Sequence, residues 1–173
     1  FYWGQLYMDK NAGEFNAQVY EPFRSLAEVR NANPQSGADL LIAKGKVMYQ
    51  MCIGCHQETG LGGTSPEAPP LAGSDWVNAP IPDRIIRIPL HGLAGPIKVN
   101  GKDYSLSMAA LGSSLSNEDL AAVLTYIRQA WGNKAGPVTS EQVAAVRQDT
   151  AGRAEDGTKP WSDEELQKFS DGR

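Results

Sequence analysis

The five residues from Cys52 to His56 hold both cysteines of the 173-residue chain and one of its two histidines. Their order is C-x-x-C-H, the arrangement through which a c-type haem is attached covalently. Residues three apart lie on the same face of a helix, so the thiols of Cys52 and Cys55 can reach the two vinyl groups of one porphyrin. His56 follows directly and can point a ring nitrogen at the iron. The motif predicts one covalently bound haem c with His56 as an axial ligand.

Three other interpretations of the cysteines fit the sequence less well. A tetrahedral zinc site needs two further Cys or His ligands, and only His91 follows, thirty-five residues after His56. A thioredoxin-like dithiol follows a strand and opens a helix, whereas the residues before Cys52 have the pattern of a helix that ends at the motif. A simple disulfide is the third alternative, and it too fits less well.

Composition and charge exclude several classes of function. Hydrophobic residues make up 41% of the chain, which is typical of a folded protein. No run of eighteen apolar residues occurs, so no segment of this sequence is expected to span a bilayer. Residues 36–136 carry eight Lys and Arg against eight Asp and Glu. Because no basic stripe is present, nucleic acid is not an expected partner.

The elements that must position the motif are predicted to be helices joined by long loops. Apolar residues recur at intervals of three and four from Leu40 to Met51, which predicts a helix that delivers the motif. Residues 57–80 are rich in Gly, Pro and Ser and predict a long loop, a feature that is usually functional in a compact domain. A short helix is expected to begin with the run Asp83 to Ile88, to be disturbed by Pro89 and to end at Gly92.

A second loop is predicted from Leu93 to Ser116, because Gly95-Pro96 and Asn100-Gly101 are turn signals. The clearest helix follows it, with Ser116 as its cap. Two shorter helices are expected after Thr139 and Ser162, each with a capping-box residue three positions later.

The chain is divided by these patterns into three parts. Residues 1–35 form an N-terminal extension that is membrane-proximal or docks a partner, residues 36–136 form the haem domain, and residues 137–173 form a C-terminal extension with short helices. The charged stretch from Asp149 to Lys159 is expected to be a mobile connector.

The second axial ligand decides the chemistry of a haem protein. A methionine sulfur favours ferrous haem, whereas an empty site admits oxygen, peroxide or nitric oxide. Met48 and Met51 lie beside the motif and cannot reach the opposite haem face. Met108 lies in the loop before the clearest helix, from which the chain can fold back, and it is the predicted ligand. His91 is a weaker competitor, since a histidine beside a helix-ending glycine is usually a polar cap.

With these residues placed, the chain resembles the class I monohaem c-type cytochromes over about residues 37–133. The resemblance rests on Gly45 and Tyr49 before C-x-x-C-H, on Pro-Pro-Leu-Ala-Gly at 69–73, on Met108 and on Tyr126. It implies an all-α cytochrome c fold in which helices pack around one haem. Ala109 follows Met108 where many members have proline.

The resemblance also implies roles for individual residues. Gly45 would let the first and last helices cross closely, since it has no Cβ. The Pro69 carbonyl would accept from Nδ1 of His56 and fix the ring, and Leu71 would pack on the porphyrin.

Further contacts with the haem propionates are hypotheses from residue type. Arg84 and Arg87 either pair with the propionates or form a solvated helix face, and both interpretations stay open. Tyr104 can donate to a propionate from the second loop.

The segment Trp131-Gly132-Asn133-Lys134 is similar to monohaem cytochrome subunits and domains of bacterial respiratory complexes, oxidases and quinoprotein dehydrogenases. That resemblance implies outer-sphere electron transfer between redox partner proteins, as a subunit of a membrane-associated complex, without enzymatic turnover of a small-molecule substrate. It implies a periplasmic location or the outer face of the cytoplasmic membrane. The alternative is a haem enzyme or gas sensor with an open or labile sixth coordination site.

Overall fold

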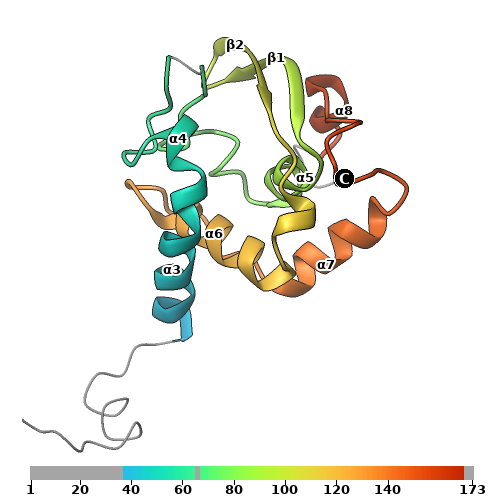
Figure 1. Ribbon diagram of the computed structural model, residues 1–173. Helices are drawn as coiled ribbons and strands as arrows, with labels where there is room; N and C mark the ends of the chain where they lie inside the picture. Colours follow the sequence, from blue (N-terminus) through green and yellow to red (C-terminus); the bar gives the residue numbers. More distant parts are fainter. Residues whose placement is uncertain (1–36, 65–66, 170–173) are drawn as a thin grey trace, which may run out of the picture. The chain divides into compact units, whose positions relative to one another are not determined.

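The structure is a computed structural model that describes residues 37–64 and 67–169 (Figure 1). The predicted N-terminal extension, residues 1–35, lies outside the described residues. Within the described part, helices dominate and surround one apolar core, as expected for the cytochrome c fold. No helix in this part combines the length and apolar character that crossing a membrane requires.

The haem motif lies at the end of a helical segment. Helix α3 (Gly37–Met48) leads into the 3-10 helix η1 (Tyr49–Met51) and then into the single turn α4 (Ile53–His56), which contains Cys55 and His56. Gln57 ends this turn with a φ of 62° and sends the chain into the following loop. The predicted delivery of the motif by a helix is confirmed.

Helix α3 crosses α6 (Asn117–Gln129) closely (Figure 1). A Cβ built on Gly45 would lie 2.0 Å from the carbonyl oxygen of Ala122 and 2.7 Å from Cβ of Tyr126. No side chain larger than hydrogen fits there, so the close approach implied by the resemblance is confirmed. An ion pair between Lys44 and Asp119, 2.7 Å long, joins the same two helices.

The region predicted as a second loop begins with a β-hairpin. Strand β1 (Leu93–Val99) pairs antiparallel with β2 (Lys102–Met108), and Leu93 lies opposite Met108. Asn100 and Gly101 have φ values of 52° and 77°, and positive φ at both central residues is what a type I′ hairpin turn requires. The loop prediction was wrong for residues 93–108. Pro96 resembles a turn residue in the sequence but lies inside β1, an edge strand that tolerates a proline.

Helix α5 (Asp83–His91) precedes the hairpin and runs past Pro89 to His91, so its predicted end at Gly92 is confirmed. Gly92 ends it with a φ of 81°. The proline sits in the last turn, where the lost N–H affects only one intrahelical bond.

The helix starts predicted from capping residues are confirmed. Ser116 caps α6, and full capping boxes open α7 (Ser140–Asp149) at Thr139 and α8 (Asp163–Gln167) at Ser162. Each cap satisfies amide groups that the first helical turn leaves without partners.

The stretch from Asp149 to Lys159 is held by contacts, and its prediction as a mobile connector was wrong. Thr150 is buried, and Arg153 pairs with Glu165 and donates to the carbonyl oxygen of Lys159 at 2.7 Å. The charged side chains that made the stretch resemble a connector are held by partners outside it: Asp149 pairs with Arg87, and Arg153 with Glu165.

Candidate haem site

The core contains a cavity of about 340 Å³ that is lined almost entirely by apolar side chains. Its walls come from α4, the loop after it, α5, both strands and α6. The residues that close it include Ala68, Leu71, Trp76, Val77, Ile85, Ile88, Leu93, Ile97, Val99, Leu111, Leu115, Leu120, Val123, Leu124 and Ile127. An apolar cavity between helices with few polar groups is a typical cofactor site.

The three residues of the attachment motif all line this cavity: Cys52, Cys55 and His56. The two cysteines are not joined in a disulfide; Cys52 is half-buried and Cys55 is exposed. Before the haem is attached, burial, reinforced by the neighbouring Cys55, raises the pKa of the Cys52 thiol to about 11. The two thiols and the imidazole therefore share one edge of a haem-compatible cavity, and the donor set fits a c-type haem.

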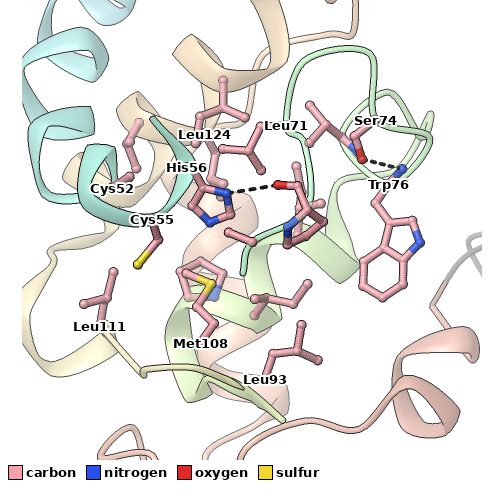
Figure 2. A pocket seen from close by; sticks show the side chains of 18 of the residues that line it. Cys52, Cys55, His56, Leu71, Ser74, Trp76, Leu93, Met108, Leu111 and Leu124 are labelled. Carbon is pink, nitrogen blue, oxygen red and sulfur yellow. Dashed lines mark hydrogen bonds between the residues drawn. The ribbon is translucent and has the colours of Figure 1, made fainter. Parts of the chain in front are cut away.

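The ring of His56 is oriented by the loop that follows it. Nδ1 donates to the carbonyl oxygen of Pro69 at 3.3 Å (Figure 2). Burial lowers the pKa of His56, against the opposing effect of that hydrogen bond. The neutral imidazole is thus favoured with its proton on Nδ1, which leaves Nε2 as the free ligating nitrogen.

Met108 reaches the same cavity from another element. It is the last residue of β2 and lines the cavity together with Ala109 and Leu111, which follow it. Figure 2 shows His56 and Met108 entering this space from different parts of the chain, the histidine from α4 and the methionine from the hairpin. Pro69 and Leu71 also line it, so the structure brings six of the predicted site residues together.

The remaining predicted site residues do not line the cavity. Arg84 is buried with its guanidinium 4.1 Å from the ring centre of Trp76, and Trp76 is a wall residue. Arg87 is buried against Phe169 and forms a 2.7 Å ion pair with Asp149. Contact of these arginines with haem propionates stays a prediction.

Tyr104 is buried in the hairpin, beneath the ammonium group of Lys102. Its hydrogen bond to a propionate also stays a prediction. His91, the weaker competitor for the iron, is 1% exposed and lies outside the wall. Its Nδ1 donates to the carbonyl oxygen of Ala154 at 3.2 Å, and its Nε2 lies 2.8 Å from the Thr150 hydroxyl. Both nitrogens are engaged, so His91 joins α5 to the C-terminal region.

Sequence reasoning missed the role of Asn133 in holding the haem loop. Its Oδ1 accepts from the amide of Gly73 at 2.9 Å and from Nδ2 of Asn78 at 2.8 Å. Its Nδ2 donates to the carbonyl oxygens of Leu71 at 3.0 Å and Ile127 at 2.8 Å. All four hydrogen-bonding positions of this buried amide are used, and they tie the loop that presents the Pro69 carbonyl to the end of α6.

Trp131 holds the other end of the same loop. Its Nε1 donates to the carbonyl oxygen of Glu58 at 3.0 Å, and its ring lies so close to Gly60 that a Cβ there would be 2.6 Å away. Its ring also packs edge-on against Tyr126 and tilted against Tyr49. The run Trp131-Gly132-Asn133 carried a signal in the sequence, but only its long-range partners reveal what it does.

The comparisons with known proteins agree with this site. Residues 42–131 match the profile of the cytochrome c family. The chain is 37% identical over 120 residues to cytochrome c-552 of Thermus thermophilus, an alignment that spans 64% of this chain and 79% of that protein. The chain belongs to the cytochrome c family. It carries a haem c attached through Cys52 and Cys55 and transfers electrons.

Other relatives are subunits of dehydrogenases. The chain is 36% identical over 97 residues to the cytochrome c subunit of a quinone alcohol dehydrogenase of Gluconacetobacter polyoxogenes, which is 56% of this chain and 20% of that subunit. It is 33% identical over 116 residues to the gluconate 2-dehydrogenase cytochrome c subunit of Pantoea cypripedii, 64% of this chain and 25% of that subunit. The chain thus spans between a fifth and a quarter of these two relatives.

Proposed function

We propose that this chain is a single-haem electron carrier with a closed, six-coordinate iron held between His56 and Met108. The observation that carries the proposal is that both side chains line one apolar cavity from different elements, α4 and the end of β2. Bound haem supplies an iron that alternates between the ferric and ferrous states. A histidine and a thioether together favour the ferrous state and raise the reduction potential.

The protein residues have three tasks in this function. The Pro69 carbonyl keeps the proton of His56 on Nδ1 and holds the ring plane. The wall from α5, α6 and the hairpin excludes water, which keeps the surroundings similar in both redox states and limits the reorganisation that slows electron transfer. Cys55 and Met51 line the cavity and are exposed, Met51 by 50%, so they mark an edge where a redox partner can approach.

The ligation is tested with the oxidised and reduced holoprotein. The oxidised protein is expected to show the near-infrared sulfur-to-iron band, and the reduced protein is expected to bind carbon monoxide slowly. Met108→Ala should lose the band and bind carbon monoxide rapidly, with haem still covalently attached. A wild-type protein without the band, or with rapid binding, would contradict the proposed ligation.

We further propose that the chain works outside the cytoplasm, in the periplasm or on the outer face of the membrane, as a subunit of a respiratory or dehydrogenase complex, and itself transforms no small-molecule substrate. The two dehydrogenase subunits that it resembles support this assignment. A chain lacking residues 1–30 tests whether the N-terminal region docks the partner subunits. Retention of the haem spectrum with loss of co-purifying subunits is the expected result; a collapsed spectrum would show that the region is needed for the haem fold.

A further inference from the structure

The C-terminal region is in direct contact with the chain that follows Met108. Nη2 of Arg147, on α7, donates to the carbonyl oxygens of Gly112 at 3.0 Å and Leu115 at 2.6 Å. These carbonyls belong to the short 3-10 turn η2 (Gly112–Ser114) and the residue after it. Nη1 of Arg147 pairs with the carboxylate of Glu155. One guanidinium therefore bridges this turn and the C-terminal region.

The turn fits tightly under this ion pair. A Cβ on Gly112 would lie 2.5 Å from Oε2 of Glu155 and 2.5 Å from the carbonyl oxygen of Leu90. The amide of Leu111 donates to the carbonyl oxygen of Pro89 at 2.7 Å. The turn is thus enclosed between α5 and the Arg147–Glu155 pair, and a shift of that pair would release one side of it.

The other side of Met108 is also held by the C-terminal region. Leu93, which lies opposite Met108 in the hairpin, forms a parallel bridge with Trp161. The amide of Trp161 donates to the carbonyl oxygen of Gly92, and the amide of Ala94 donates to the carbonyl oxygen of Trp161, both at 2.9 Å. The strand neighbour of Met108 and the turn after it are therefore attached to the same C-terminal region.

The position of Met108 at a strand end makes these attachments important for the site. The hairpin ladder ends at Met108, so its backbone depends on what holds the residues that follow. Those residues also form the cavity wall, through Ala109, Leu111 and Leu115. Hydrogen bonds from a charged donor are stronger than neutral ones, and Arg147 donates two of them to Gly112 and Leu115, in the segment that follows the end of the regular pairing.

We propose that Arg147 is a positioning residue for Met108: by holding the carbonyls of Gly112 and Leu115, with Glu155 fixing its guanidinium, it keeps the methionine sulfur seated on the iron. The proposal rests on the proposed function, because it requires Met108 to be the ligand. It gives the C-terminal region a role in the redox site in addition to its role in the core.

The proposal is tested on the full-length holoprotein with Arg147→Met. This variant keeps much of the apolar stem and removes the donors. We expect a weaker near-infrared band, carbon monoxide binding to the ferrous protein about tenfold faster, and a lower reduction potential, since a charged hydrogen bond contributes enough to change an equilibrium by about that factor. The matched control is Val143→Ala on the same helix, which removes buried apolar contacts but leaves the bonds of Arg147 intact.

The two variants separate positioning from general stability. Both should unfold at lower guanidinium concentration than the wild type, but only Arg147→Met should change the band and the carbon monoxide rate. Equal changes in both variants, or no change in Arg147→Met, would overturn the proposal. If Arg147→Met yields no holoprotein, Glu155→Ala is used instead. A near-infrared band and a carbon monoxide binding rate equal to those of the wild type in Glu155→Ala would then overturn the proposal. A wild-type protein without the band, or a band that survives Met108→Ala, would instead overturn the proposed ligation.

Discussion

At the scale of single residues, the Asn133 side chain stabilises the haem loop from outside the cavity wall. Its amide joins the backbone of Leu71 and Gly73 to the end of α6, and the residue is only 5% exposed. Removing the amide would leave buried backbone groups without hydrogen-bond partners. A buried backbone group without a partner costs more than the hydrogen bond itself contributes.

We expect Asn133→Leu to lower the free energy of unfolding by about 3 kcal/mol, because it strands the amide of Gly73 and the carbonyl of Ile127 and leaves the Leu71 carbonyl only its bond from the Ser74 amide. Guanidinium unfolding of the holoprotein, followed by circular dichroism and haem absorbance, measures this loss. Asn117→Ala, at the first position of α6, is the matched control and should stay within about 0.5 kcal/mol of the wild type. A loss below about 1 kcal/mol for Asn133→Leu would contradict the role of the amide.

The ion pair between Lys44 and Asp119 makes the stability of the protein depend on pH. Hydrogen bonds from the side chains of Lys44 and then Ser116 hold the pKa of Asp119 below its usual value of 3.8. A carboxyl group with a lowered pKa in the folded state stabilises the protein above its ordinary pKa, and this contribution is lost as the pH falls through the folded pKa. Asp119 is 31% exposed on its side chain, so solvent screening keeps the contribution at about 0.5 kcal/mol.

Asp119→Asn should therefore be less stable than the wild type at pH 7, and the difference should shrink as the pH is lowered below about 4. Chemical unfolding of both holoproteins at a series of pH values measures it, and added salt at pH 7 should also reduce it. A difference that stays constant from pH 7 to pH 3 would show that the loss comes from packing and not from charge.

At the scale of elements, the crossing of α3 and α6 determines where the attachment motif lies. Gly45→Ala places a methyl group 2.0 Å from the Ala122 carbonyl oxygen, and backbone in the middle of a helix cannot move aside cheaply. We expect a loss of about 3 kcal/mol or more in the free energy of unfolding and a lower yield of haem-loaded protein. Gly37→Ala, where nothing lies within 4 Å, should be neutral or slightly stabilising. Similar unfolding curves for the two variants would show that the helices separate easily at this point.

The elements also show what local sequence patterns can and cannot predict. Helices α6, α7 and α8 were predicted because the residues that cap them lie within one helical turn of each other in the sequence, such as Thr139 and Gln142. The hairpin was missed because Gly95 and Pro96 resemble a turn, and only the pairing of β1 with β2 makes them part of a strand.

The site shows the same division between local and long-range information. Cys52, Cys55 and His56 are recognisable because the spacing for covalent haem attachment is local. Asn133 and Arg147 are not, since their partners lie between six and sixty-two residues away in the chain and no short pattern specifies them.

At the scale of the whole molecule, the described residues form one core and not a haem domain with an appendage. Val138, Val143, Val146, Trp161 and Leu166 come from the predicted C-terminal extension, yet all are buried in the same cluster as the cavity wall. The three-part division therefore describes the sequence better than it describes the packing of residues 37–169. Burial of these side chains contributes about 1.5 to 3 kcal/mol each for the larger ones, so the C-terminal region is part of what makes the haem cavity stable.

The charge of the whole molecule predicts how it exchanges electrons. Residues 36–136 carry equal numbers of basic and acidic side chains, and the entire chain has a net charge of −4. Steering by charge is strong only where one sign dominates the approach surface. The rates of reaction with a small anionic and a small cationic metal complex should each change by less than about threefold between 0.05 and 0.5 M salt, as stopped-flow absorbance would measure.

Glu67→Lys is the matched control, because Glu67 is an exposed residue that lines the cavity. Reversing its charge should speed the reaction with the anionic complex, slow the reaction with the cationic complex and make both rates depend more steeply on salt. A tenfold or larger salt effect on the wild type would mean that charge from outside residues 36–136 dominates the electron-transfer edge.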